Sequence, residues 1–145
     1  MLSYESAPSK WRGREVSVDF AEARAALSVC VDSAGKLIAV GCAPTDAIVW
    51  GAGRSEALQI LVGHTNWVVS LAFAKDGRLL ISGAGDGTAR VWDRNTGKGI
   101  GRIRFPGEST YVESVGFSPD ARTAFALSSG RLIMARVLEP DATQR

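Results

Sequence analysis

The sequence predicts an all-β protein made of about three similar units, each with four short antiparallel strands. Three observations predict this class. A pattern of residues recurs about every 42 to 44 positions, apolar and small or polar residues alternate within it, and Asp-Gly and Asn-x-Gly signals separate the alternating runs. A period of two is typical of β-strands, and such turn signals join neighbouring strands in tight hairpins.

The repeat is clearest between VDSAGKLIAVG (31–41) and FAKDGRLLISG (73–83), which lie 42 positions apart. Gly35 then corresponds to Gly77, and a third, more divergent copy begins with VGFSPDARTAFAL at 115–127. A fixed period of this length is typical of repeated supersecondary units. We therefore divide the chain into an N-terminal extension (1–19), three units (about 20–60, 61–103 and 104–138) and a C-terminal tail (139–145).

The central unit shows the order of the strands most plainly. The runs VVSLAFA, RLLISGA, TARVWD and KGIGRIRF are separated by KDG, GDG and RNTG turns. In the first unit, the alanines and charges of FAEARAALSV (20–29) leave a short helix open, but superposition on the repeat makes the second half of this segment a strand. The hairpin around DSAGK would pair Cys30 with about Ala39, so we expect Cys30 and Cys42 to be free thiols.

Composition excludes several functional classes. The 145 residues are 46% apolar and 22% charged, which is typical of a folded domain, and the net charge of +2 is too small to predict nucleic acid as a partner. No stretch approaches the ~20 apolar residues of a membrane span, and the N-terminus has no apolar signal region. We therefore expect a cytoplasmic protein without a membrane partner. One histidine and two cysteines without C-x-x-C spacing predict no metal site, and no motif predicts a cofactor.

The glycines of SGAGDGTARVWD (82–93) could belong to a phosphate-binding loop or to a turn. A phosphate loop needs a following helix, whose N-terminal amides hold the anion. The run TARVWD is short, alternating and β-branched, and no Gly-Lys-Ser or Gly-Lys-Thr follows. The GDG sequence is therefore interpreted as a turn between two strands, and the same holds for WGAGRSEA (50–57).

The central unit, LVGHTNWVVSLAFAKDGRLLISGAGDGTARVWD (61–93), resembles a WD repeat, with Gly63-His64 at its head and Trp92-Asp93 at its tail. Proteins of this family form β-propellers, in which four-stranded blades of ~40 to 45 residues surround a channel. The resemblance implies a partial β-propeller of about three four-stranded antiparallel blades. It also implies that the protein is an interaction platform.

Four residues of the central unit, His64, Ser82, Asp86 and Trp92, include the ingredients of a nucleophilic triad. The resemblance implies a different role, a buried hydrogen-bonded chain from the Trp indole through Ser and His to Asp. No G-x-S-x-G nucleophile elbow supports catalysis. We therefore interpret the four residues as structural, and only the central unit carries the full set.

The function predicted from the resemblance is a non-catalytic scaffold or adaptor for protein partners. The family's usual partner-facing positions correspond to Asn66, Trp67 and Gly85 in the central unit. Trp67 is the strongest candidate because Trp is enriched at binding hot spots, and packing between blades is its alternative role. The alternative function is a regulatory or substrate-binding propeller domain associated with an enzyme. A catalytic channel usually needs several inward-facing carboxylates or histidines, and this chain has a single histidine.

The number of units raises a further expectation. Closed propellers usually have four to eight blades, so about three blades leave apolar faces uncovered at both ends. We expect the chain to complete a propeller with another copy of itself or as part of a longer chain.

Overall fold

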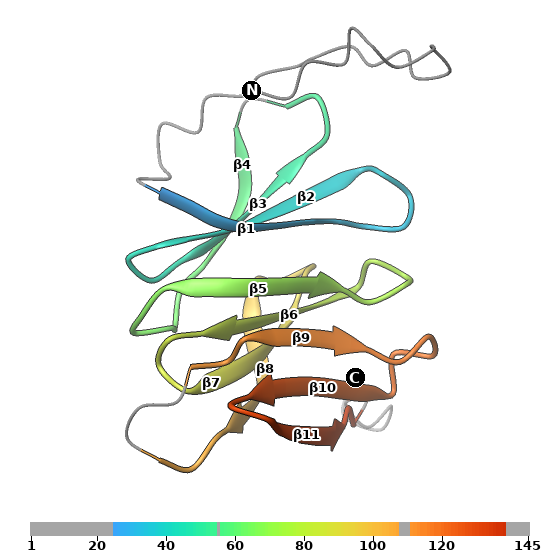
Figure 1. Cartoon of the computed structure of the whole chain (residues 1–145). Coiled ribbons are helices and arrows are strands. Elements are labelled where there is room, and N and C mark those ends of the chain that lie inside the picture. Colours follow the sequence, from blue (N-terminus) through green and yellow to red (C-terminus); the bar gives the residue numbers. More distant parts are fainter. Residues whose placement is uncertain (1–24, 55, 108–110, 139–145) are drawn as a thin grey trace, which may run out of the picture.

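The structure is a computed structural model that describes residues 25–54, 56–107 and 111–138. These residues form eleven β-strands in three antiparallel sheets, which are stacked in chain order (Figure 1). The expected extension (1–19) and tail (139–145) lie outside the described residues. Within them the chain is all-β, as the alternating pattern predicted.

Each sheet is a meander in which strands pair in sequence order. Sheet 1 contains β1 (Ala25–Val31), β2 (Leu37–Ala43), β3 (Ala47–Gly51) and β4 (Ala57–Leu61). Sheet 2 contains β5 (Val68–Phe73), β6 (Leu79–Ala84), β7 (Thr88–Asp93) and β8 (Lys98–Arg104). Sheet 3 contains β9 (Ser114–Phe117), β10 (Thr123–Ser128) and β11 (Arg131–Arg136).

The first strands of the sheets lie side by side. β1 contacts β5, and β5 contacts β9, so the three sheets radiate from a shared inner edge formed by β1, β5 and β9 (Figure 1). The outermost strands, β4 and β8, are at the opposite edge of sheets 1 and 2. This is the arrangement of blades in a partial propeller.

Several expectations can be compared with this topology. Residues 25–29 are in β1, so the second half of the segment with helical character is a strand, while residues 20–24 lie outside the description. Cys30 is paired with Ala39, as the hairpin predicted, and both cysteines are free thiols. Four strands per sheet hold for sheets 1 and 2, whereas sheet 3 has three among the described residues.

Alternation along each strand gives every sheet two faces, which we name by direction along the chain. The forward face points to the following sheet and the backward face to the preceding one. The forward face of sheet 1 (Ala39, Val49) packs against the backward face of sheet 2 (Leu80, Trp92). The forward face of sheet 2 (Ile81, Val91) packs in the same way on the backward face of sheet 3 (Ala124, Ala126). The core is therefore two apolar layers, each between neighbouring sheets.

Glycine permits close approach in both layers. A Cβ on Gly41 would lie 2.5 Å from the carbonyl oxygen of Val68 in sheet 2. A Cβ on Gly83, at the corresponding position 42 residues later, would lie 2.7 Å from Cγ1 of Val112. The inner parts of neighbouring sheets are thus closer together than any side chain at these positions allows.

Candidate functional site

A hydrogen-bonded chain connects the four motif residues of the central unit. The indole Nε1–H of Trp92 donates to Ser82 Oγ at 2.8 Å, and Ser82 Oγ lies 2.7 Å from Nε2 of His64. Nδ1 of His64 lies 2.9 Å from Oδ2 of Asp86. The structure therefore brings all four residues together.

Each member of this chain comes from a different part of the fold. Trp92 is on β7, Ser82 is on β6, and Asp86 is in the β6–β7 turn. His64 belongs to the connection 62–67, which leads from the outer strand of sheet 1 to the inner strand of sheet 2. The network consequently fixes the crossing between two sheets onto the second of them. The His64 and Trp92 rings also meet edge to face, with centroids 6.2 Å apart.

One arrangement of protons satisfies every group. The Ser82 hydroxyl donates to Nε2 of neutral His64, and the Nδ1–H of His64 donates to the Asp86 carboxylate. Burial lowers the pKa of His64, although Asp86 opposes this shift, so the neutral imidazole is favoured. Burial alone would raise the pKa of Asp86, but hydrogen bonds from the Thr88 side chain, the Thr65 amide and His64 lower it to about 2.

The Ser82 hydroxyl is enclosed by its two hydrogen-bond partners. Ser82 is fully buried and Trp92 is 2% exposed, so the Ser82 hydroxyl presents no surface to a substrate. The same hydroxyl already accepts a hydrogen bond from the indole while it contacts His64. A buried polar network of this kind stabilises a fold because each donor has an acceptor.

The glycine-rich segment is a turn, as predicted. It connects β6 to β7, and Gly87 has a φ of +77°, a conformation that glycine adopts without strain. Asp86 Oδ1 accepts hydrogen bonds from the backbone N–H of Thr88 at 2.9 Å and from its hydroxyl at 2.6 Å. A strand follows instead of a helix, so this turn lacks the helix N-terminus of a phosphate loop.

The three predicted partner-binding residues lie together where β5 begins and β6 ends. The backbone N–H of Gly85 donates to the carbonyl of Trp67 at 2.9 Å, and the Asn66 side-chain amide donates to the carbonyl of Gly85 at 3.3 Å. The Asn66 side-chain oxygen accepts from the Trp67 N–H at 2.8 Å. Trp67 is 56% exposed, so its side chain is not packed between sheets.

A fourth residue on this rim, Tyr111, was not predicted. It lies 44 positions after Trp67 and is 52% exposed. Its carbonyl accepts a hydrogen bond from the Ser128 hydroxyl at 2.8 Å, and the N–H of the next residue, Val112, donates to the carbonyl of Ala84. Trp67 and Tyr111 thus flank the end of β6. The repeat position was the signal that could have identified Tyr111.

Other kinds of site have less support in the part of the chain that the structure describes. No group of three or more His, Cys, Asp or Glu side chains is close enough there to hold a metal ion. The described residues also contain no helix with the length and hydropathy needed to span a bilayer. Burial raises the pKa of the Cys30 thiol to about 12, which makes this thiol a poor nucleophile.

Comparison with known proteins identifies the family to which this chain is similar. The family model for the WD domain, G-beta repeat, matches residues 55–93, which include all four network residues. Over 118 residues the chain is 31% identical to the periodic tryptophan protein 2 homolog of Schizosaccharomyces pombe. The chain belongs to the WD-repeat family. The WD-repeat match begins just before β4 and ends with β7, so one family repeat extends over two sheets.

Other relatives are WD-repeat proteins with different names. The chain is 35% identical over 92 residues to eukaryotic translation initiation factor 3 subunit I of Schizosaccharomyces pombe, and 31% identical over 87 residues to nuclear distribution protein PAC1 of Arthroderma benhamiae. These matches cover 63% and 60% of this chain but 27% and 19% of the relatives. The match to the periodic tryptophan protein covers 79% of this chain and 14% of that relative. The chain therefore spans a minor part of each relative.

A solved structure has the same fold. The β-propeller domain of Cps50 (Swd1) from Myceliophteria thermophila superposes with a TM-score of 0.71 at 22% sequence identity. The superposition covers 80% of this chain and 37% of that chain. The described residues accordingly have the fold of a partial β-propeller.

Proposed function

We propose that the chain is a non-catalytic scaffold that binds protein partners in the cytoplasm through the rim formed by Asn66, Trp67, Gly85 and Tyr111. The observation that carries this proposal is the exposure of Trp67, at 56%, on a backbone that is hydrogen-bonded on both sides. An exposed tryptophan on a fixed backbone offers a partner a large apolar surface at a defined position.

The neighbours of Trp67 support a defined binding surface. A Cβ on Gly85 would lie 3.0 Å from Cγ of Asn66, so a side chain at residue 85 would displace the amide that orients Trp67. Tyr111 adds a second exposed aromatic ring at the other side of β6. Exposed aromatic residues of this kind are enriched in protein–protein interfaces.

The names of the relatives also favour a protein-binding scaffold. One is a subunit of a translation initiation factor and another is a nuclear distribution protein, and neither name describes an enzyme. The Ser82 hydroxyl is buried and hydrogen-bonded, so it is not accessible to a substrate. These observations favour a scaffold over a catalytic domain.

The test is affinity capture with the purified chain and its Trp67→Ala variant. We expect proteins retained by the wild-type chain to be lost from Trp67→Ala. Leu58→Ala is the matched control, because Leu58 is 45% exposed on β4, away from the rim. Circular dichroism should show that both variants are folded. Equal capture by all three proteins would contradict the role of the rim.

We further propose that the chain completes its propeller with another copy of itself or with blades of a longer chain. Val29 and Val31 on the backward face of sheet 1 are 66% and 54% exposed. Leu132 and Met134 on the forward face of sheet 3 are 56% and 65% exposed. Leu127 occupies the forward-face position that is Gly41 in sheet 1 and Gly83 in sheet 2. A sheet packed on sheet 3 must therefore stand further away than sheets 2 and 3 do from each other.

Light scattering and sedimentation of the purified chain test this second proposal. We expect a mass above that of one chain at micromolar concentration. Binding of a hydrophobic dye reports whether the two end faces are covered. A monomer that stays soluble on dilution and binds no dye would contradict completion by a second copy.

A further inference from the structure

We infer that the rim at Trp67 binds a basic side chain, an arginine or a lysine, from a segment of its protein partner, and that Glu113 is the counter-ion. This inference rests on the proposed scaffold function and adds the chemistry of the partner. The rim lies on the side of the stack where β5 and β9 begin and β6 and β10 end (Figure 1). Glu113 is two residues after Tyr111, directly before β9, and is exposed.

Trp67 and Tyr111 belong to backbone segments on the two sides of β6. The carbonyl of Trp67 accepts a hydrogen bond from the N–H of Gly85, and the N–H of Val112 donates to the carbonyl of Ala84. Neighbouring strands are about 4.8 Å apart, so these two segments are about 10 Å apart. Both aromatic side chains are exposed, and neither contacts an aromatic ring or a cation of another described residue. A partner segment that crosses the end of β6 can therefore contact both rings.

Glu113 adds a negative charge to the backbone segment that carries Tyr111. Its Oε1 accepts a hydrogen bond from the N–H of Ser129 at 3.0 Å, so the side chain is held against the β10–β11 turn. Oε2 has no hydrogen bond to another described residue, and Glu113 forms no ion pair in the described part of the chain. One carboxylate oxygen is therefore fixed in position, and the other is accessible to a cation.

Glu113 occupies a repeat position that is apolar in the two preceding sheets. Leu27 and Val69 are the extra residues at register shifts in β1 and β5, where the inner strand has one residue more than its neighbour. A bulge of this kind redirects a side chain away from the regular alternation of the strand. Glu113 is at the corresponding position of sheet 3, 44 residues after Val69. Sheet 3 thus supplies a charge at a position where the repeat has aliphatic residues.

The loops on this side of the stack contain acids and no cations. The described loops are the β2–β3, β6–β7 and β10–β11 turns and the connections 62–67, 105–107 and 111–113. They contain Asp46, Asp86 and Glu113 but no Lys or Arg. Arg104 and Arg131 are at the ends of the outer strands β8 and β11 and form no ion pair with these acids. The inner part of this side therefore attracts a basic segment and disfavours an acidic one.

Aromatic rings and a carboxylate together favour a cation over an apolar anchor. A guanidinium or ammonium group is attracted to an aromatic face within about 6 Å and forms charge-assisted hydrogen bonds with a carboxylate. An aliphatic side chain placed on this rim would instead take Oε2 of Glu113 out of water without a hydrogen-bond donor, which costs free energy. A basic side chain is the partner group that satisfies both features.

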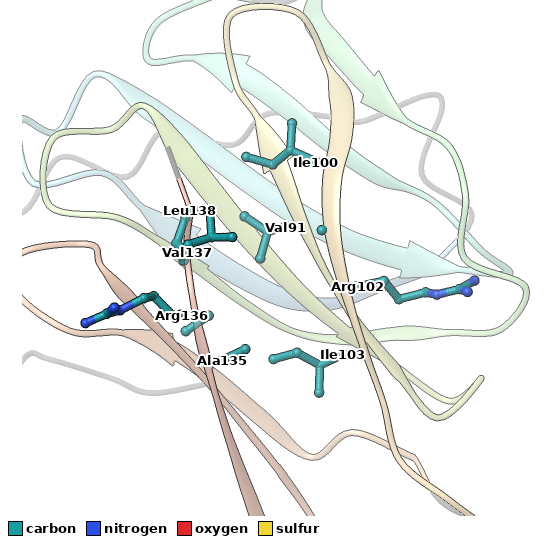
Figure 2. Close-up of a pocket in the computed structure, with 10 residues that line it drawn as sticks. Val91, Ile100, Arg102, Ile103, Ala135, Arg136, Val137 and Leu138 are labelled. Carbon is teal, nitrogen blue, oxygen red and sulfur yellow. The ribbon is translucent and has the colours of Figure 1, made fainter. Parts of the chain in front are cut away.

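The cavity between β8 and the end of β11 lacks this combination (Figure 2). It measures about 250 Å³, and no Asp or Glu is among its lining residues. In Figure 2 the side chains of Arg102 and Arg136 extend away from its apolar centre. The cavity therefore offers a basic side chain no counter-ion, and the rim is the place where the partner's cation would bind.

The experiment is a titration of the full-length, nitrogen-15-labelled chain with a capped peptide, Gly-Ala-Ala-Arg-Ala-Ala-Gly, followed by NMR. Three further peptides carry Lys, Gln or Glu in place of Arg. The chain has four tryptophans, and the indole signal that is missing in Trp67→Phe is that of Trp67. We expect the Arg and Lys peptides to shift this signal, and their affinity to fall as salt rises. Equal binding of the Arg and Gln peptides, or tighter binding of the Glu peptide, would overturn the inference.

Glu113→Gln tests the counter-ion. Gln keeps an oxygen that can accept the hydrogen bond from the Ser129 N–H, so the variant removes the charge and preserves the turn contact. We expect it to bind the Arg peptide about two- to five-fold more weakly at low salt, with a smaller salt dependence. Glu56→Gln is the matched control, because Glu56 is exposed in the β3–β4 turn on the opposite side. Equal affinity of the wild type and Glu113→Gln would overturn the role of Glu113.

Two substitutions of Trp67 separate attraction to the ring from apolar contact. Trp67→Leu keeps an apolar side chain without an aromatic face, and we expect it to weaken the Arg peptide about two- to five-fold. Trp67→Phe should weaken it less. Shifts of backbone amide signals measure binding in both variants, and thermal unfolding shows that they are folded. Equal affinity of Trp67→Leu and the wild type would overturn the contact between the cation and the ring.

The outcomes separate this inference from the scaffold proposal on which it rests. Suppose that Trp67→Ala loses its captured proteins, whereas Glu113→Gln retains them at low and high salt. The rim is then a binding surface whose partner is not basic, so the inference is overturned and the scaffold proposal stands. Equal capture by the wild type and Trp67→Ala would overturn both.

Discussion

Ser28 and Ser70, which lie 42 positions apart, each join their own sheet to the next one through the side-chain oxygen. Ser28 Oγ donates to the carbonyl of Val68 at 3.3 Å, and Ser70 Oγ accepts from the N–H of Val115 at 3.1 Å. Both serines are on the inner strand of their sheet. Ser114 occupies the same position on β9 and is exposed, so it can make this contact to a further sheet.

The first prediction concerns the indole of the buried network. Replacing Trp92 by Ala should lower the free energy of unfolding by about 3 to 5 kcal/mol, because it empties a site that is 2% exposed. Trp92→Phe should cost less, since it keeps most of the apolar contact and loses the hydrogen bond to Ser82. Urea denaturation followed by circular dichroism measures both. An unchanged midpoint for Trp92→Ala would contradict its place in the core.

The second prediction concerns close approach of sheets 2 and 3. Gly83→Ala should destabilise the chain by about 1 to 3 kcal/mol, because the new methyl group would lie 2.7 Å from Cγ1 of Val112 and 2.9 Å from Cγ1 of Val115. Gly116→Ala is the matched control, since a Cβ there meets nothing within 4 Å. Thermal unfolding compares the two variants. Equal melting temperatures for Gly83→Ala and Gly116→Ala would show that sheets 2 and 3 can move apart without loss of stability.

The third prediction concerns pH. The folded pKa of Asp86, about 2, is below the ordinary value of 3.8. The ionised carboxylate therefore stabilises the fold fully above pH 3.8, and this stabilisation is lost as the pH falls toward 2. The folded pKa of His64 is also lowered from 6.5, so protonation of the unfolded chain reduces stability as pH falls below 6.5. The wild type should therefore become steadily less stable on acidification from pH 7.

The Asp86→Asn variant isolates the carboxylate. It should be less stable than the wild type at pH 7, and the difference should shrink between about pH 4 and pH 2 as Asp86 itself becomes protonated. Asp76→Asn, at an exposed position in the β5–β6 turn, controls for the loss of one negative charge. The measurement is the urea midpoint at several pH values. If the difference in urea midpoint between the wild type and Asp86→Asn did not change with pH, the ionised Asp86 carboxylate would not stabilise the fold.

The sequence was sufficient to predict strands, turns and the registers within hairpins. These features depend on local alternation of apolar and polar residues and on glycine at fixed positions. The pairing of Cys30 with Ala39 is an example. It was not sufficient to predict that one family repeat begins with the last strand of one sheet and continues into the next. A period of 42 residues gives the length of a repeat but not the point at which it begins. Residue Tyr111 was missed because the third copy has diverged, with Ala135 at the position of Trp92.

The two ends of the stack are different faces of the fold, with Val29 and Val31 exposed at one end and Leu132 and Met134 at the other. Association of one end with the other is head-to-tail, so the two chains contribute different surfaces to each contact. Head-to-tail contacts close into a ring only when the rotation per chain divides a full circle, and otherwise they extend into a filament. The angle between successive sheets, which Gly41 and Gly83 help to set, therefore decides between a finite assembly and a fibre.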